Sequence, residues 1–199
     1  ISFALEPGRH CALIGSTGTG KTTLVAIIRR PEGYLFDGKL LTEGAGRIGY
    51  LSQFTGQEKN RNITVFDYLS EEFIRLQEKT DAVCGAMETA EELDDLLERY
   101  QLLLDEAQSI DADNYERNIQ RQLRLAELDG KADLELSKLS GGEYKLVQVI
   151  RQMLRYPGLL IMDEPDVFLD FENLTGLGDL INAYEGTLLV ITHSRYLLG

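Results

Sequence analysis

One stretch of the chain decides its fold: Gly15-Ser16-Thr17-Gly18-Thr19-Gly20-Lys21-Thr22. It fits the pattern G-x-x-x-x-G-K-[ST], in which glycines let backbone N–H groups fold around phosphate oxygens. Residues 10–14, just before it, are mostly apolar and predict a short buried strand. A helix is predicted from about Lys21 until Pro31 ends it, and its N-terminus adds partial positive charge at the loop. A strand before the stretch and a helix after it indicate a phosphate-binding loop rather than a glycine-rich turn without function.

Two side chains of this loop supply a charge and a metal ligand. Lys21 can place its ammonium group on the phosphate oxygens, and the Thr22 hydroxyl can ligate Mg²⁺. The residues predicted to bind the nucleotide are Gly15, Ser16, Thr17, Gly18, Thr19, Gly20, Lys21, Thr22 and Thr23.

A second motif is an apolar strand that ends in two acids, Leu159-Leu160-Ile161-Met162-Asp163-Glu164. Such a strand delivers Asp163 to the C-terminal edge of a parallel sheet, where ligands of these sheets bind. We expect Asp163 to hold Mg²⁺ through water. Glu164 is the expected base or positioning group for an attacking water.

Apolar strands and helices alternate on both sides of a helical middle region. Strands are predicted at 10–14, 47–51, 159–162 and 187–191, and further helices at 143–156 and 174–184. Because the strands are apolar throughout, they predict a parallel sheet covered on both faces. The predicted fold class is therefore α/β, that of a P-loop nucleoside triphosphatase.

The middle region, from about Thr64 to Leu128, is rich in leucine and charged residues. Apolar side chains recur there at three- and four-residue steps, which predicts a helix over 88–108: Leu93, Leu96, Leu97, Tyr100, Leu103, Leu104 and Ala107. A second helix is predicted at 114–128, with Asp113 or Asp111 as its N-cap. A turn between them would make an extended antiparallel hairpin. The alternative is an ordinary helical subdomain packed on the core.

Three parts of the chain are predicted from these patterns. Residues 1–63 form the first part of the nucleotide-binding core, 64–136 form the helical subdomain with its hairpin, and 137–199 complete the core. The chain starts at Ile1 without a methionine, so it is expected to be a piece of a longer protein.

Composition limits the location and the partners. No apolar run approaches the roughly 18 to 20 residues that a membrane span needs. Cys11 and Cys84 have no metal-type spacing, which favours a reduced, cytoplasmic domain. The formal net charge of −13 gives broad nucleic-acid binding no electrostatic help.

A third motif opens the helix that follows the middle region, Leu139-Ser140-Gly141-Gly142-Glu143. Ser140 can cap this helix, and the paired glycines expose backbone to an anion. The motif lies between the phosphate-binding loop and the two acids, and in this order it resembles the signature of the ATP-binding cassette (ABC) family. Other family marks follow in order: Gln53 after a strand, Val167-Phe168-Leu169-Asp170 as the D-loop, and His193 after the last strand.

The resemblance implies the roles of these residues. The ligands would be ATP and Mg²⁺, with Gln53 reaching the metal and the attacking water. His193 would contact the γ-phosphate and help to orient Glu164. The family also implies a sandwich dimer in which Ser140 and Gly142 contact ATP bound to the opposite cassette, with Asp170 near the seam. One cassette alone would bind ATP but hydrolyse it poorly.

Within the family, the chain looks like the first cassette of the F subfamily, soluble proteins that act on ribosomes. The long interval between Gln53 and Leu139 is where that subfamily places a helical arm. The run from Tyr184 to Leu198 reads like its final strand and switch, and Glu143 is a common signature residue there. The partners implied are a second cassette and the ribosome. Two alternatives stay open: the ATPase subunit of a membrane transporter, and a chromosome-maintenance or repair ATPase.

Overall fold

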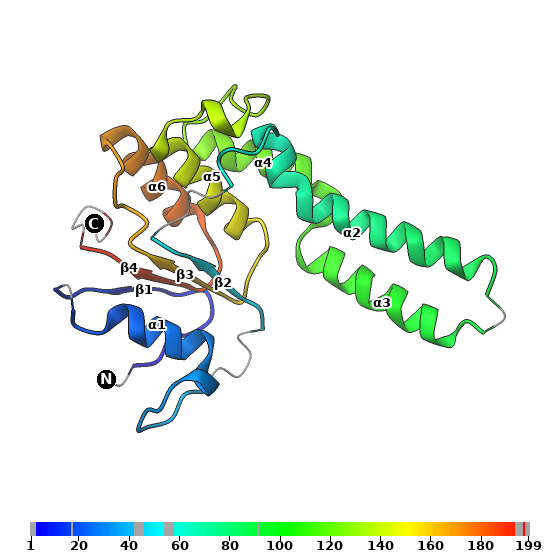
Figure 1. The fold of residues 1–199 in the computed structure, drawn as a ribbon, viewed down its shortest axis with the longest axis horizontal. Helices are drawn as coiled ribbons and strands as arrows, with labels where there is room; N and C mark the ends of the chain where they lie inside the picture. Colours follow the sequence, from blue (N-terminus) through cyan, green and yellow to red (C-terminus); the bar gives the residue numbers. More distant parts are fainter. Residues whose placement is uncertain are drawn as a thin grey trace.

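The computed structural model describes residues 3–16, 18–41, 46–53, 58–90, 92–193 and 197. It has an α/β core from which two long helices project (Figure 1). The core contains one parallel four-stranded sheet in the order β1-β4-β3-β2. Its strands are β1 (His10–Leu13), β2 (Ile48–Leu51), β3 (Leu159–Asp163) and β4 (Leu188–Ile191). The predicted parallel sheet is confirmed.

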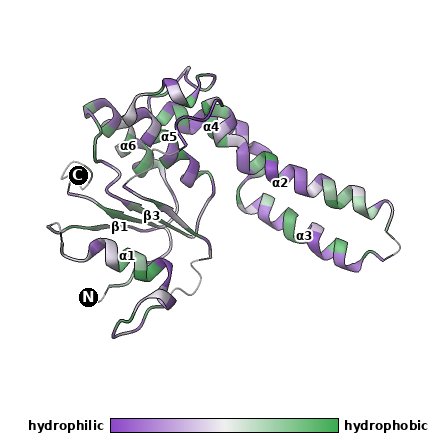
Figure 2. Ribbon diagram, viewed as in Figure 1, coloured by the Kyte–Doolittle hydropathy of each residue, from purple (hydrophilic) through white to green (hydrophobic). Residues whose placement is uncertain are grey.

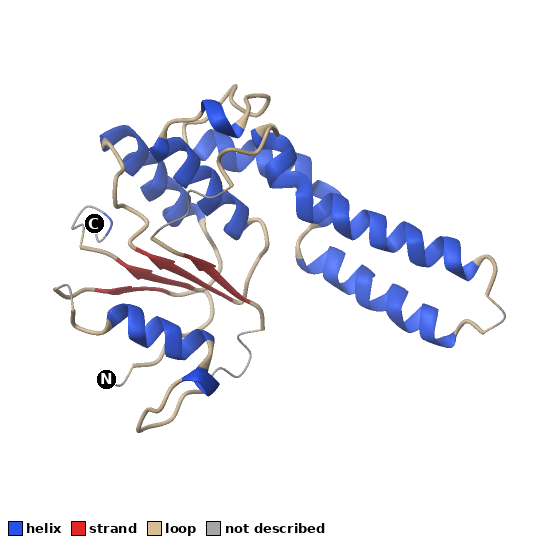
Figure 3. Ribbon diagram, viewed as in Figure 1, coloured by secondary structure: helices blue, strands red, loops and turns tan. Residues whose placement is uncertain are grey.

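Helices cover both faces of the sheet, as Figure 3 shows with strands in red and helices in blue. One face packs against α1 (Lys21–Arg29), and the other carries α5 (Gly141–Met153) and α6 (Phe171–Ala183). The strand residues divide between two apolar clusters because successive side chains point to opposite faces. Ile161, Leu189 and Ile191 join the α1 side, whereas Leu160, Met162, Leu188 and Val190 join the other. This alternation confirms a sheet buried on both sides.

The helical region corrects one prediction. It contains α2 (Val65–Met87), α3 (Asp94–Ser109) and α4 (Tyr115–Leu125). The antiparallel pair is α2 and α3, here called the arm (Figure 1). A hairpin made from residues 88–108 and 114–128 is therefore wrong, because α3 pairs with α2, whereas α4 packs against α2, α5 and α6.

Burial explains why α4 leaves the hairpin. Ile119 and Leu123 are almost completely buried in the main core, whereas no residue of α3 is buried. Several leucines of α3 stay on the surface, and apolar and polar residues alternate along the arm in Figure 2. The expected cap of α4 is also wrong. Asn114 occupies the N-cap position without a side-chain cap, and Asp111 instead accepts hydrogen bonds from the Asn114 and Asn118 amides.

Ion pairs fasten the base of the arm to the core. Arg151 of α5 contacts Glu71 at 2.7 Å and Glu58 at 2.9 Å, and Arg155 and Arg47 both pair with Glu72 of α2. Although partial burial acts in the opposite direction, the two guanidinium groups hold the pKa of Glu72 below its usual value. Networks of this kind hold geometry better than isolated surface pairs. These pairs join α2, at the base of the arm, to α5 and the residues that follow it.

Two helical glycines offer a matched test of the packing. A Cβ at Gly176 of α6 would lie 2.9 Å from the backbone oxygen of Ala126, whereas a Cβ at Gly85 of α2 would meet nothing within 4 Å. Gly176→Ala should destabilise the fold by about 1–2 kcal/mol, because backbone cannot yield to the added methyl. Gly85→Ala should stabilise it by about 0.5–1 kcal/mol through the lower entropy of the unfolded chain. Chemical unfolding of both variants checks the pair, and a shift of the same sign in both would contradict this packing.

Candidate nucleotide-binding site

The glycine-rich loop joins the end of β1 to the start of α1. Gly18 and Gly20 have φ angles of 85° and 84°, in the left-handed region that glycine adopts without strain. Lys21 Nζ donates to the carbonyl oxygens of Gly15 at 2.7 Å and Ser16 at 3.0 Å. The ammonium group therefore lies against the loop itself. Thr17 lies outside the described residues.

The sheet places Asp163 on the same side as this loop. Asp163 ends β3 with its side chain on the face of Ile161, which is the face that α1 covers. The carboxylate is buried, and Tyr50 Oη donates to its Oδ2 at 3.4 Å. Thr22 lies in the first turn of α1. Carboxylate and hydroxyl oxygens fit Mg²⁺, and an ion shared with nucleotide phosphates needs only one or two carboxylates. Among the described residues, no cluster of three or more His, Cys, Asp or Glu could hold a metal.

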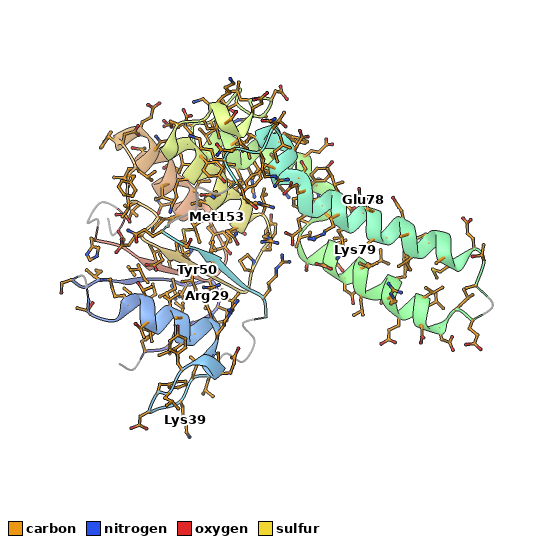
Figure 4. All side chains as sticks on the ribbon, viewed as in Figure 1. Arg29, Lys39, Tyr50, Glu78, Lys79 and Met153 are labelled. Atoms are coloured by element: carbon orange, nitrogen blue, oxygen red, sulfur yellow. The ribbon has the colours of Figure 1, made fainter. Side chains whose placement is uncertain are left out.

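Tyr50 is a residue of the site that the sequence analysis missed. Burial and the nearby Asp163 raise the pKa of this phenol, so it stays a hydrogen-bond donor. The guanidinium of Arg29 stacks over its ring, 3.7 Å from the centroid, as Figure 4 shows between α1 and the sheet. Tyr50 is thereby fixed from one side by α1 and fixes Asp163 on the other. In the sequence it is a tyrosine on an apolar strand, and nothing there marks it as a partner of Asp163.

Three strand ends bring the predicted catalytic side chains together. Gln53 Nε2 donates to Glu164 Oε2 at 2.8 Å, and His193 Nε2 lies 3.4 Å from Glu164 Oε1. These residues follow β2, β3 and β4, which are neighbours in the sheet and end at the same edge. Glu164 itself has a φ of 50°, and its amide donates to the oxygen of Ile191 at 2.9 Å. Both carboxylate oxygens thus have a partner from an adjacent strand.

The signature motif forms the N-terminus of α5. Ser140 Oγ accepts from the amide of Glu143 at 3.2 Å, and Glu143 Oε2 accepts from the amide of Ser140 at 2.7 Å, which makes a capping box. Partial burial raises the pKa of Glu143, but hydrogen bonds from Lys131 and Ser140 outweigh it and hold this pKa below its usual value. Glu143 therefore stabilises its own helix as a carboxylate. Ser140 and Gly141 remain exposed, with Leu139 buried beneath them.

The D-loop meets this motif at a glycine. Asp170 caps α6 by accepting from the amide of Asn173 at 2.9 Å. Asn173 approaches Gly142 so closely that a Cβ there would lie 2.6 Å from its amide nitrogen. Phe168 is 85% exposed beside this junction. Phe171, on the other side of Asp170, is 75% exposed, so two aromatic rings flank the cap of α6.

The phosphate-binding loop and the acids at the edge of the sheet define a P-loop nucleoside triphosphatase with the ABC-type fold. The model of the ABC transporter family matches residues 1–167, and the chain belongs to this family as an ATPase cassette. No helix of the described residues combines the length and the apolar character that crossing a membrane demands.

Similar proteins point to cassettes of the F-subfamily type. The chain is 30% identical to the energy-dependent translational throttle protein EttA of Haemophilus influenzae over 100% of its length and 36% of EttA. It is 31% identical to an uncharacterised ABC transporter ATP-binding protein of Bacillus subtilis, over 97% of this chain and 38% of that protein. It thus spans little more than a third of these relatives. Among solved structures, an archaeal ribosome recycling factor in complex with a ribosomal stalk protein superposes with a TM-score of 0.62 at 22% identity, over 98% of this chain and 30% of that one. That last likeness concerns the fold alone.

Proposed function

We propose that this cassette binds Mg-ATP and hydrolyses it when a second cassette closes over the site. The observation that carries the proposal is the convergence of Gln53 and His193 on the two oxygens of Glu164. A carboxylate held at both oxygens has a fixed direction, as a group that must orient one water requires.

Each remaining residue of the site has a part in this reaction. The loop amides and Lys21 bind the β- and γ-phosphates, and the start of α1 adds partial positive charge. Thr22, Asp163 and Gln53 are the residues that would hold Mg²⁺, which neutralises the charge that develops on the phosphates. Tyr50 keeps the Asp163 carboxylate in place. Glu164 then accepts a proton from the attacking water or orients it, and His193 keeps that carboxylate aligned.

The second cassette would bind where the signature motif is exposed. Ser140 and Gly141 lie at the positive end of α5, and this end is suited to a γ-phosphate held by the opposite cassette. Asp170 and the exposed Phe168 border the same surface. Glu143 is committed to its own helix, and Gly142, to which the resemblance gave a contact in trans, is buried against Asn173. The contact in trans would therefore come from Ser140 and Gly141.

We further propose that the complete protein is a cytoplasmic F-subfamily factor that acts on the ribosome. The similarity to a protein named as a translational throttle supports this, and so does the arm. The charge of the arm suits binding to a basic protein surface better than binding to an RNA backbone. Its helix α3 has a single basic residue, Arg99, and five acidic ones: Asp94, Asp95, Glu98, Asp105 and Glu106. An ATPase subunit of a membrane transporter is the alternative, which the names of other relatives keep open.

A sedimentation experiment separates these two functions. The complete protein carrying Glu164→Gln, which should retain ATP, is loaded with ATP and run with ribosomes on a sucrose gradient. We expect the protein to move into the ribosomal fractions only when ATP is present. A protein that stays at the top of the gradient in the presence of ATP would favour the transporter subunit instead. A variant with the arm shortened between residues 76 and 104 is the matched control. It should still bind ATP but should no longer move into the ribosomal fractions.

A further inference from the structure

One lysine of the signature helix lies buried where α5 meets β2. Lys145 is only 7% exposed, and its Nζ donates to the carbonyl oxygens of Ser52 at 3.1 Å and Gln53 at 3.2 Å. Lysine is almost never fully buried without partners, because removing its charge from water is costly. The site must therefore use the charge or the hydrogen bonds of this side chain.

The charges around Lys145 come from the strand that carries the catalytic acids. Burial lowers the pKa of Lys145, whereas Asp163 and Asp166 act to raise it. Asp166 Oδ1 is buried and has no hydrogen-bond partner in the described part of the chain. Lys145 thus lies within electrostatic range of the turn after β3 while its hydrogen bonds go to the segment after β2.

The residue that Lys145 holds is the one that reaches Glu164. The Gln53 carbonyl accepts from Lys145, and the Gln53 side chain donates to Glu164. Lys145 also lies little more than one helical turn after Ser140, which caps the same helix. One side chain therefore connects the start of α5 to the carboxylate at the edge of the sheet. A shift of α5 by one or two ångströms would break these two bonds, because hydrogen bonds weaken steeply beyond about 3.5 Å.

We propose that Lys145 is a positioning residue that couples the signature helix to Glu164 by holding the backbone of Ser52 and Gln53. This inference rests on the proposed ATPase function. When the signature surface closes on the second cassette, Lys145 transmits the new position of α5 to Gln53, and Gln53 sets the direction of Glu164. Nucleotide binding by the loop does not pass through this connection.

Lys145→Met in the complete protein tests the proposal, because methionine keeps most of the apolar stem and removes the three N–H donors. We expect kcat for ATP to fall about 10- to 100-fold, the cost of a misplaced catalytic group, while KM and nucleotide affinity change less than about 2-fold. Thermal stability should fall modestly, because two backbone carbonyls lose their donor, and the protein should remain folded. Lys79→Met, the same change at an exposed lysine of α2 in the arm, away from the sheet (Figure 4), should leave kcat unaltered.

Two further measurements distinguish positioning from a merely structural role. In a Gln53→Ala background, Lys145→Met should cause no additional loss of kcat, because the Gln53 side chain that connects Lys145 to Glu164 is already absent. Amide hydrogen exchange over residues 50–53 should be faster in Lys145→Met than in the parent without nucleotide. An unchanged kcat, a full additional loss in the Gln53→Ala background, or unchanged exchange would each overturn the proposal. If the unmodified protein showed no turnover at all, the ATPase function would fail, and the exchange measurement would still decide whether Lys145 holds this segment.

Discussion

Lys21→Ala is expected to lower the affinity for ATP by about 100-fold or more. The Lys21 ammonium lies against the carbonyl oxygens of Gly15 and Ser16 and is the full positive charge placed at this loop by the first turn of α1. Removing the cation of a charge-assisted pair with phosphate costs about 2–5 kcal/mol, and 1.4 kcal/mol is already tenfold in the dissociation constant. Titration with ATP, by calorimetry or with a fluorescent analogue, measures the change.

Lys39→Ala is the matched control for this prediction. Lys39 is an exposed lysine beyond α1, remote from the loop in Figure 4, and its loss should leave ATP affinity within about 2-fold, as surface charges contribute little. Circular dichroism of both variants confirms that the helices are kept. An unchanged affinity in Lys21→Ala would show that the loop is not the phosphate site.

The sheet could be predicted from the sequence because its signals are local. Each strand is a short run of apolar residues. Strands that are apolar throughout are typical of a parallel sheet buried on both faces. The meeting of Gln53, Glu164 and His193 was implied by the resemblance to the ABC family. The sheet explains it, since all three residues come directly after strands whose ends share one edge. Their roles remain predictions that mutants must test.

The arm was mispredicted because periodicity says which face of a helix is apolar but not what covers it. The leucines of α3 and those of α4 recur at the same spacing, yet only Ile119 and Leu123 of α4 are buried in the core. One local signal was overlooked. Thr64 and Asp67 form a capping box that starts α2, and its recognition would have added the missing helix.

The contacts of Tyr50 and Lys145 belong to a different class, because they join residues far apart in the chain. A tyrosine on an apolar strand and a lysine in an amphipathic helix are ordinary in sequence. Only the packing of α1 and α5 on the sheet turns them into partners of Asp163 and Gln53. Spacing rules carry no information about such pairs, so the structure was needed to find them.

Glu164→Gln is expected to keep ATP binding within about 3-fold and to lower turnover by about 100- to 10,000-fold, the contribution typical of a general base. The amide has the shape of the carboxylate, and its oxygen can still accept from Gln53, so the loop and the metal ligands are undisturbed. What is lost is the charge that orients or deprotonates the attacking water. Phosphate release under steady-state conditions measures turnover, and filter binding measures retained ATP.

The same variant also tests the second cassette. If closure requires ATP and opening requires hydrolysis, Glu164→Gln should accumulate in the closed form with ATP at both sites, seen as one bound nucleotide per cassette that survives gel filtration. Glu172→Gln, an exposed glutamate in the first turn of α6, should retain normal turnover and release its nucleotide. Normal turnover in Glu164→Gln would remove Glu164 from its role, whatever the state of the dimer. Lost turnover without retained ATP would instead mean that hydrolysis at this site does not control the separation of the two cassettes, since the chemistry would then be blocked while the closed form still opens.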